Sequence, residues 1–231
     1  MKVRGYELEI GADLAGADLT DADLRSVDLS GSWVGGAVLS GSDLSDARLV
    51  GADLRHAICR ATVFADADLH HANLWNADLT DARLGGAVLS RAWLGNARLG
   101  GTDLRSADLG GAWLTAADLT GALLCATTLA GASLTRTCMR DTDLTGTFAG
   151  GADLRGAILN GATIRAANLS GAILRGTSLI DADLSLADLV GADLTGAQMD
   201  GVSLDGIRHD ETTTWPEGFQ PPSSGNLDDH D

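Results

Sequence analysis

A five-residue period runs without a slip from Ala12 to Gly206, and it constrains the fold more than any other feature of the chain. Steps of five from Leu14 to Leu204 visit 39 positions, and 32 of them are Leu. The residue two places before each is small or β-branched, and in 28 of the 39 units it is Ala. A period of five matches neither an α-helix nor a flat strand, so we interpret it as a tandem structural repeat.

The recurring apolar positions predict one continuous core. If every fifth side chain points inward, the chain turns by a constant angle per unit and stacks into coils, with the small Ala positions near the corners, where larger side chains would overfill the coil. A quarter turn per unit gives a square coil of four units, although periodicity alone also permits three-sided coils. Representative members of the predicted core ladder are Leu14, Leu54, Cys59, Phe64, Met139, Ile164, Met199 and Leu204.

The unit A-[D/N]-L-x-x, as in Ala17-Asp18-Leu19-Thr20-Asp21, resembles the signature of the pentapeptide-repeat proteins. The resemblance covers about 195 of the 231 residues. It implies an all-β fold, the right-handed quadrilateral parallel β-helix, with about ten 20-residue coils and no loop insertions. At an ordinary strand spacing of about 4.8 Å, such a rod would be roughly 47 Å long.

The chain divides into a repeat domain at 12–206 and a short segment at each end. Residues 1–11 lie outside the period, and the alternation of Tyr6, Leu8 and Ile10 predicts a short strand that caps the first coil. Residues 207–222 set Trp215 and Phe219 among Thr and Pro, which predicts a C-terminal cap with Trp215 as its plug. Residues 223–231 are polar and acidic, so we expect a disordered tail.

Composition limits the classes of partner that the protein can bind and the cellular compartment that we expect for it. The net charge of −16 argues against direct binding to nucleic acid or to an anionic membrane surface. No apolar run has the length of a membrane span or of a signal-peptide core. Cys59 falls on an inward position and Cys125 and Cys138 on different outward columns, too far apart for disulfides, so we expect reduced thiols and a cytoplasmic protein.

Residues 20 apart should stack in one column, so sequence position assigns each outward side chain to one of four faces. All four Trp of the repeats fall on the face centred on Leu14, Val34 and Leu54, which also carries four Asp and four Arg. Aromatic residues with Arg nearby and little net charge are typical of interface cores. The alternative is that Trp93 and Trp113 only cover their own coils. The predicted protein-contact residues are Trp33, Trp75, Trp93, Trp113, Arg155 and Arg175.

The next face is the most acidic. It carries eight Asp against Arg60, Arg98 and Arg140, a net charge of −5. These acidic residues are Asp18, Asp21, Asp78, Asp81, Asp118, Asp141, Asp181 and Asp200.

The sequence offers little for catalysis, and we interpret the chain as not an enzyme, with no catalytic, cofactor-binding or metal-binding residues. His56, His70 and His71 fall on different columns or faces, so a metal site is not expected. Asp recurs at the same place in the repeat, which makes it a lattice feature and not a tuned acid–base pair. A straight rod also lacks a cleft that could exclude water.

Three functions remain open. The first is a rigid rod that binds another protein, or a second copy of itself, through the Trp-bearing face or an acidic face. The second follows from the family resemblance: a DNA mimic that binds DNA gyrase or another type II topoisomerase and protects it from quinolones or other poisons, a form of antibiotic resistance. About 47 Å of duplex carries roughly 28 charges, against −16 for the whole chain, so the mimicry would be partial. The third is a passive structural spacer.

Overall fold

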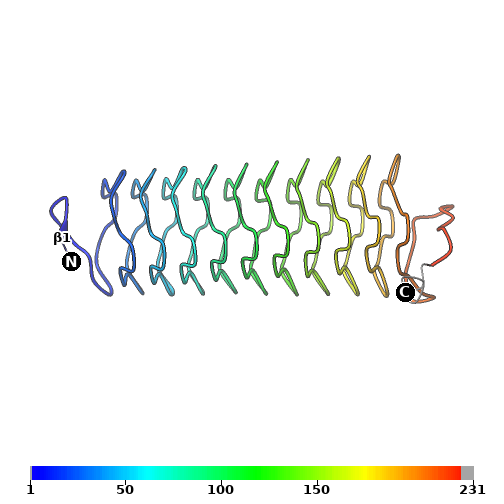
Figure 1. Ribbon diagram of the computed structural model, residues 1–231, viewed down its shortest axis with the longest axis horizontal. Helices are drawn as coiled ribbons and strands as arrows, with labels where there is room; N and C mark the ends of the chain where they lie inside the picture. Colours follow the sequence, from blue (N-terminus) through cyan, green and yellow to red (C-terminus); the bar gives the residue numbers. More distant parts are fainter. Residues whose placement is uncertain (1, 225–231) are drawn as a thin grey trace, which may run out of the picture.

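The computed structural model describes residues 2–224, which form a straight rod of stacked coils (Figure 1). Two short strands, β1 (Lys2–Val3) and β2 (Tyr6–Glu7), pair antiparallel ahead of the first coil. In the repeats, single-residue parallel bridges join positions 20 residues apart, and each coil has four of them, as at Asp13, Asp18 and Asp23. The coil is therefore four-sided, as the resemblance implied. We number the coils from coil 1 (12–31) to coil 10 (192–211).

Every backbone N–H group of a typical repeat unit has a hydrogen-bond acceptor, either within the unit or in an adjacent coil. In the unit around Leu104, the N–H groups of Asp103, Leu104 and Ser106 donate to carbonyls of the adjacent coils at 2.8 to 3.1 Å. The N–H of Ala107 donates across the corner to the Leu104 carbonyl at 3.0 Å. The fifth N–H, of Arg105, donates to Oδ1 of Asp103 at 3.1 Å. Buried backbone groups need such partners, so the unit repeats as a complete hydrogen-bonding module.

The bond from Arg105 to Asp103 explains the acidic residue of the repeat signature. Within the repeats, all 18 Asp or Asn residues at this position accept a hydrogen bond from the N–H two residues later. Short side chains with an oxygen at the γ-carbon are suited to this local turn. The Asp of A-[D/N]-L therefore stabilises the corner.

The residue two places after each inward Leu turns the corner with left-handed backbone angles. The φ angle is 57° at Asn76, 58° at Asp81 and 58° at Arg136. Asn, Asp and Gly adopt this region at the lowest cost, which accounts for their frequency at the position.

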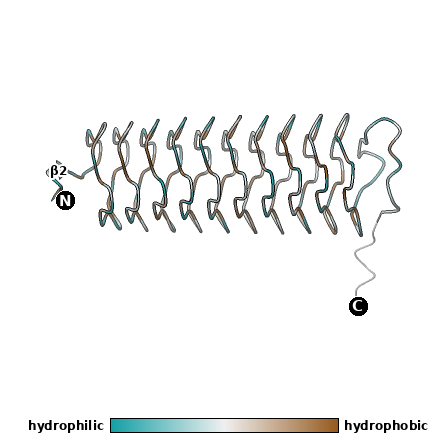
Figure 2. Cartoon of the chain, turned by 90° about the horizontal axis from the view of Figure 1, so that it is seen from above, coloured by the Kyte–Doolittle hydropathy of each residue, from teal (hydrophilic) through white to brown (hydrophobic). Residues whose placement is uncertain are grey.

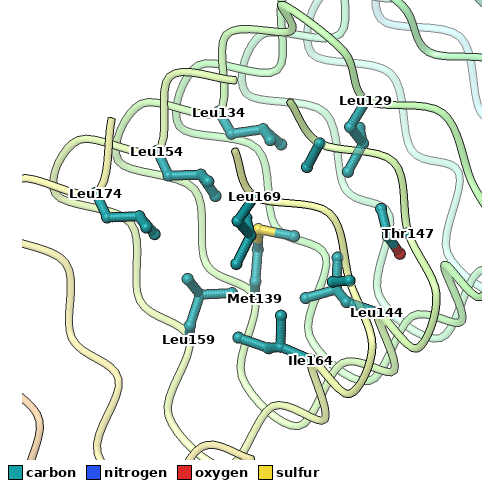
Figure 3. Close-up of a pocket in the computed structure, with 12 residues that line it drawn as sticks. Leu129, Leu134, Met139, Leu144, Thr147, Leu154, Leu159, Ile164, Leu169 and Leu174 are labelled. Carbon is teal, nitrogen blue, oxygen red and sulfur yellow. The ribbon is translucent and has the colours of Figure 1, made fainter. Parts of the chain in front are cut away.

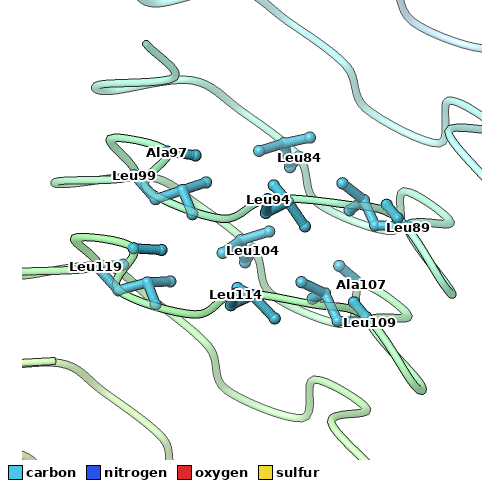
Figure 4. Packing of buried hydrophobic residues seen from close by; sticks show 14 of the residues in the cluster. Leu84, Leu89, Leu94, Ala97, Leu99, Leu104, Ala107, Leu109, Leu114 and Leu119 are labelled. Atoms are coloured by element: carbon cyan, nitrogen blue, oxygen red, sulfur yellow. The ribbon is translucent and has the colours of Figure 1, made fainter. Parts of the chain in front are cut away.

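The inward positions form one hydrophobic core along the rod, with Leu above Leu in successive coils (Figure 4). Hydrophobic residues accordingly recur in every coil along its length (Figure 2). In coil 3 the small Cys59 neighbours the large Phe64, and both are fully buried. Their volumes offset each other, so the core stays close-packed where the ladder departs from Leu.

A second departure from Leu leaves a cavity. Ala149 occupies a Leu position in coil 7, and a cavity of about 20 Å³ lies beside it, lined by Met139, Leu144, Ile164 and Leu169 among others (Figure 3). The unbranched Met139 side chain extends into the centre of the coil, but it does not fill the space that a Leu at 149 would occupy. Ala149, Leu144 and Leu169 are correspondingly 4 to 5 % exposed inside the core.

The ends differ from the sequence prediction. The N-terminal segment is a hairpin and not a single strand: Val3, Tyr6 and Leu8 pack against the core, whereas Ile10 is 69 % exposed. The N–H of Gly11 donates to the Ser30 carbonyl and the N–H of Ala12 donates to the Glu9 carbonyl. These bonds order the chain on both sides of Ile10, whose side chain faces solvent.

At the other end, Thr214 bridges Asp193 and Trp215 packs against the core and stacks on Phe219, with 5.4 Å between ring centroids. The cap bridges only one side of coil 10, at Asp193, so the predicted core residues Met199 and Leu204 are half-buried. Of the predicted tail at 223–231, residues 225–231 lie outside the described part of the chain.

The corner carboxylates predict acid sensitivity. Hydrogen bonds from the side chain and then the N–H of Arg25 lower the pKa of Asp23 to about 2. Bonds from the hydroxyls and N–H groups of the serines two residues later lower the pKa of Asp28 and Asp43. A lowered pKa stabilises the fold above the unfolded value near 4 and ceases to do so as pH falls through the folded value. Urea midpoints should be constant above pH 5 and fall between about pH 4 and 2.

A matched variant separates the charge of the carboxylate from its hydrogen bond. Asn73 and Asn168 accept the same backbone hydrogen bond at 3.1 and 3.0 Å. The double substitution Asp28→Asn and Asp43→Asn should therefore fold normally at pH 7 and lose less stability at pH 3 than the parent. An unchanged acid slope would show that other groups control it.

Candidate functional site

The structure places all four Trp of the repeats on one face of the rod. Trp33 is linked through the bridges of Asp53 and Asn73 to Trp93, which bridges Trp113. Trp75 lies on an adjacent outward column of the same face. The exposed fractions are 66 % at Trp33, 39 % at Trp75, 49 % at Trp93 and 43 % at Trp113. We call this surface the Trp face; it comprises the outward residues flanking Leu14 and its equivalents every 20 residues.

Trp93 and Trp113 form a tilted aromatic pair on adjacent coils, with 4.9 Å between ring centroids and 43° between planes. Both occupy the position that Asp holds elsewhere, so neither can accept the corner hydrogen bond. The N–H groups of Gly95 and Thr115 have no hydrogen-bond partner within the described chain. The pair therefore lacks this local stabilising contact and leaves about half of its surface in solvent.

Trp75 lies flat over the next coil. A Cβ atom built on Gly95 would come within 2.2 Å of Cζ3 of Trp75, so the absence of a side chain at Gly95 makes room for the ring. The φ angle of Gly95 is not left-handed, so the backbone conformation does not require a glycine at this position. The space occupied by the Trp75 ring does. The ring thus lies beside the column of Trp93 and Trp113.

A shallow depression of about 330 Å³ continues this face towards the C-terminus. It is lined by Thr115, Thr135, Arg136 and Arg155. The hydroxyls of Thr115 and Thr135 are 3.1 Å apart, and the Arg136 side chain is exposed. The sequence placed both Arg136 and Arg155 on this face, but only Arg155 was predicted as a contact residue. Gly95, Thr115 and Thr135 were not predicted, although they share the column of Trp75.

Ion pairs neutralise the rest of the Trp face. Arg55 contacts Asp53 and Arg155 contacts Asp153 through two guanidinium nitrogens each, with shortest distances of 2.7 and 2.6 Å. Hydrogen bonds from the Arg side chains lower the pKa of both carboxyls. Arg175 pairs in turn with Asp193. These pairs are exposed and contribute little to stability, but they leave the face without net charge.

The acidic face carries its eight Asp as separate columns and not as one cluster. Asp78 contacts Arg60 at 2.7 Å and Arg98 at 3.9 Å, and Asp18 and Asp118 accept corner hydrogen bonds. A further group sits at the corner itself, each with its carboxylate folded over the glycine of the next coil: Asp21, Asp81, Asp141 and Asp181.

In residues 2–224, no three His, Cys, Asp or Glu side chains are arranged to hold a metal ion. His70 and His71 contact each other, with ring centroids 4.2 Å apart, and Nδ1 of His70 lies 2.8 Å from the Ser90 hydroxyl. Burial raises the pKa of the Cys59 thiol to about 12, so it stays protonated and inert. Within the same residues, no helix has the length and apolarity needed to cross a membrane.

Comparison with known proteins identifies relatives of the repeats. The model of the family described as pentapeptide repeats matches residues 10–206. The crystal structure of HetL, a pentapeptide-repeat protein involved in heterocyst differentiation regulation in the cyanobacterium Nostoc, is 32 % identical, covers 87 % of this chain and 91 % of its own, and superposes with a TM-score of 0.58.

Two further structures are more distant. Rfr23 from the cyanobacterium Cyanothece is 32 % identical over 49 % of this chain and 63 % of its own, with a TM-score of 0.37. QnrB1, a plasmid-mediated fluoroquinolone resistance protein, is 22 % identical over 74 % of this chain and 86 % of its own, with a TM-score of 0.44. No curated protein matches the chain significantly.

Proposed function

Because this chain belongs to the pentapeptide-repeat family and folds as a right-handed quadrilateral β-helix, we propose that it is a non-enzymatic binding protein whose Trp face contacts another protein. One observation carries the proposal: the half-exposed pair of Trp93 and Trp113 on a face without net charge. Trp is one of the residues enriched in the energetic centres of protein interfaces. The free Cys125 and Cys138 suit a reducing compartment, and we propose the cytoplasm.

The rigid coil suits this role. The close-packed core fixes the backbone that carries the four Trp side chains. Little conformational freedom of the backbone is therefore lost when a partner binds. A passive spacer would not need Trp at positions where Asp stabilises the corner, so we favour a contact surface over a spacer.

The double substitution Trp93→Ser and Trp113→Ser tests this proposal. Both side chains are exposed, so the variant should keep the thermal stability of the parent within a few degrees and lose binding to proteins captured from the native cell. The matched control is Phe148→Ser, because Phe148 is also exposed, at 54 %, but lies on another face. Identical capture by the parent and the double variant would reject the Trp face as a contact surface.

The acidic face supports a second candidate, a DNA mimic that modulates gyrase or another type II topoisomerase. Its eight Asp against three Arg would present a negative stripe to a groove that binds duplex DNA. Supercoiling by purified gyrase, with and without a quinolone, tests this candidate. Inhibition or protection that is lost on Asp81→Asn and Asp141→Asn would support it; no effect at a large excess of protein would remove it.

A further inference from the structure

The bridge column of the Trp face has nearly the same sequence of residue types from either end. Each half, read from the end of the rod to its middle, contains an acidic residue, a large apolar residue, an acidic residue, a small polar residue and a Trp. From coil 1 to coil 10 the residues are Asp13, Trp33, Asp53, Asn73, Trp93, Trp113, Ser133, Asp153, Ile173 and Asp193.

Such a pattern is what a two-fold axis requires. If two rods meet face to face about an axis that lies between them and crosses the rods at right angles, they run antiparallel. Each column then faces the same column of the copy, and coil 5 of one rod faces coil 6 of the other. In this isologous contact every residue pair occurs twice. We therefore propose that the occupant of the Trp face is a second copy of this chain, with the axis between coils 5 and 6; this rests on the Trp face being a contact surface.

The centre of the contact would be aromatic. Trp93 of one copy faces Trp113 of the other, so the two tilted pairs form a cluster of four indoles. Three coils away, Trp33, the most exposed of the four at 66 %, faces Ile173. Fully desolvated aromatic residues at the centre of an interface provide most of its binding energy.

The depression provides a second match that does not depend on the palindrome. The Trp75 ring extends from coil 4 over Gly95 of coil 5, and the antiparallel register places it opposite coils 6 and 7, which carry Thr115, Thr135 and Arg136. These three residues line the depression of about 330 Å³. The indole ring of one copy can cover the depression of the other and contact the Arg136 guanidinium with its face, a favourable cation–π geometry. Each rod thus carries both the ring and the recess for its copy.

Charge also favours this face over the acidic face. The pair Asp53–Arg55 of coil 3 faces the pair Asp153–Arg155 of coil 8, and each pair is already neutralised by an ion pair within its own chain. The Trp face has no net charge and does not repel itself, whereas two acidic faces would bring ten net negative charges together, five from each. An unrelated partner would have no use for a pattern that is symmetric about the middle of the rod.

Sedimentation velocity over a range of concentrations is the first test. The parent should sediment as a dimer of 23.6 kDa chains and dissociate on dilution. Trp93→Ser with Trp113→Ser should raise the dissociation constant at least about 100-fold, as expected for the loss of two central Trp. Gly95→Ala, which displaces the Trp75 ring, should raise it about tenfold. Gly35→Ala is the matched control, because it lies in the same column and a Cβ there would make only an ordinary contact at 3.6 Å.

Cross-linking tests the register. Cys125 and Cys138 are first replaced by Ser, and Asn73→Cys and Ser133→Cys are then made in separate chains. A short bismaleimide should join the two variants when they are mixed, because coil 4 faces coil 7. It should not join either variant to itself, because the two Asn73 positions are then three coils apart, on the order of 14 Å.

Three results would overturn the proposal: a monomer at every concentration, a dimer unaffected by the Trp substitutions, or a cross-link of the Asn73→Cys variant to itself, which would indicate parallel rods. A monomeric parent whose capture of cellular proteins still depends on Trp93 and Trp113 would overturn the dimer alone and leave the contact surface in place. Circular dichroism and thermal melts confirm that each variant is folded.

Discussion

Replacing Leu94 with alanine is expected to lower the free energy of unfolding by about 3 to 5 kcal/mol. Leu94 is fully buried in the middle of the ladder, in column with Leu114 of the next coil (Figure 4). The substitution removes apolar area from the core and leaves a cavity that neighbouring coils cannot close, because their backbones are hydrogen-bonded at fixed spacing. In a solenoid each coil contacts only its neighbours, so the loss falls on the interfaces on both sides of coil 5.

Urea denaturation followed by circular dichroism measures this change. Arg98→Ala is the control within the same coil, because the Arg98 side chain is exposed and its nearest carboxylate, on Asp78, is 3.9 Å away. We expect the control to stay within about 0.5 kcal/mol of the parent. A loss below about 1 kcal/mol for Leu94→Ala would contradict a close-packed ladder.

The second large effect has opposite signs at two sites three residues apart. Ala149→Leu should raise the free energy of unfolding by about 1 to 2 kcal/mol, because the new side chain fills the cavity beside Met139. Ala152→Leu should lower it by about 1 to 3 kcal/mol, because Ala152 is fully buried at an inward corner position where a larger side chain forces the coil apart.

The same denaturation experiment compares the two variants, and Ala149→Val provides an intermediate volume. The expected order of stability is Ala149→Leu, Ala149→Val, parent and then Ala152→Leu. Equal destabilisation by both Leu substitutions would show that Met139 already fills the space, and that the coil cannot accommodate a Leu at 149.

The sequence predicted the coil because its hydrophobic period leaves few alternatives. The period alone also permits three-sided coils, and the four sides came from the family resemblance. Once the coil has four sides, the columns follow, and the positions of the four Trp in the chain are enough to place them on one face. The hydrogen bond from Arg105 to Asp103 was less accessible. The sequence shows that Asp recurs, but the unpaired N–H that it satisfies is visible only once the backbone is folded.

The ends and the cavity were harder to predict, because they depend on contacts that do not repeat. The hairpin that leaves Ile10 in solvent and the cap that leaves Met199 half-buried are single events without periodic support. The depression near Arg136 depends on how the side chains of coils 6 to 8 lie against one another, and Gly95 gained its role only through the orientation of the Trp75 ring. Such particulars follow from packing and not from pattern.

The four-sided coil separates what the interior requires from what the exterior displays. The interior repeats every five residues, so deleting a single unit would keep Leu above Leu throughout the rod. The exterior repeats only every 20 residues, so a deletion between Trp93 and Trp113 would rotate everything after it by a quarter turn and carry Trp113 to a different side from Trp93. Deletion or duplication of one unit can therefore rearrange the surface residues of such a chain while the core keeps its Leu packing. Only changes in steps of four units keep the outward residues on their original faces.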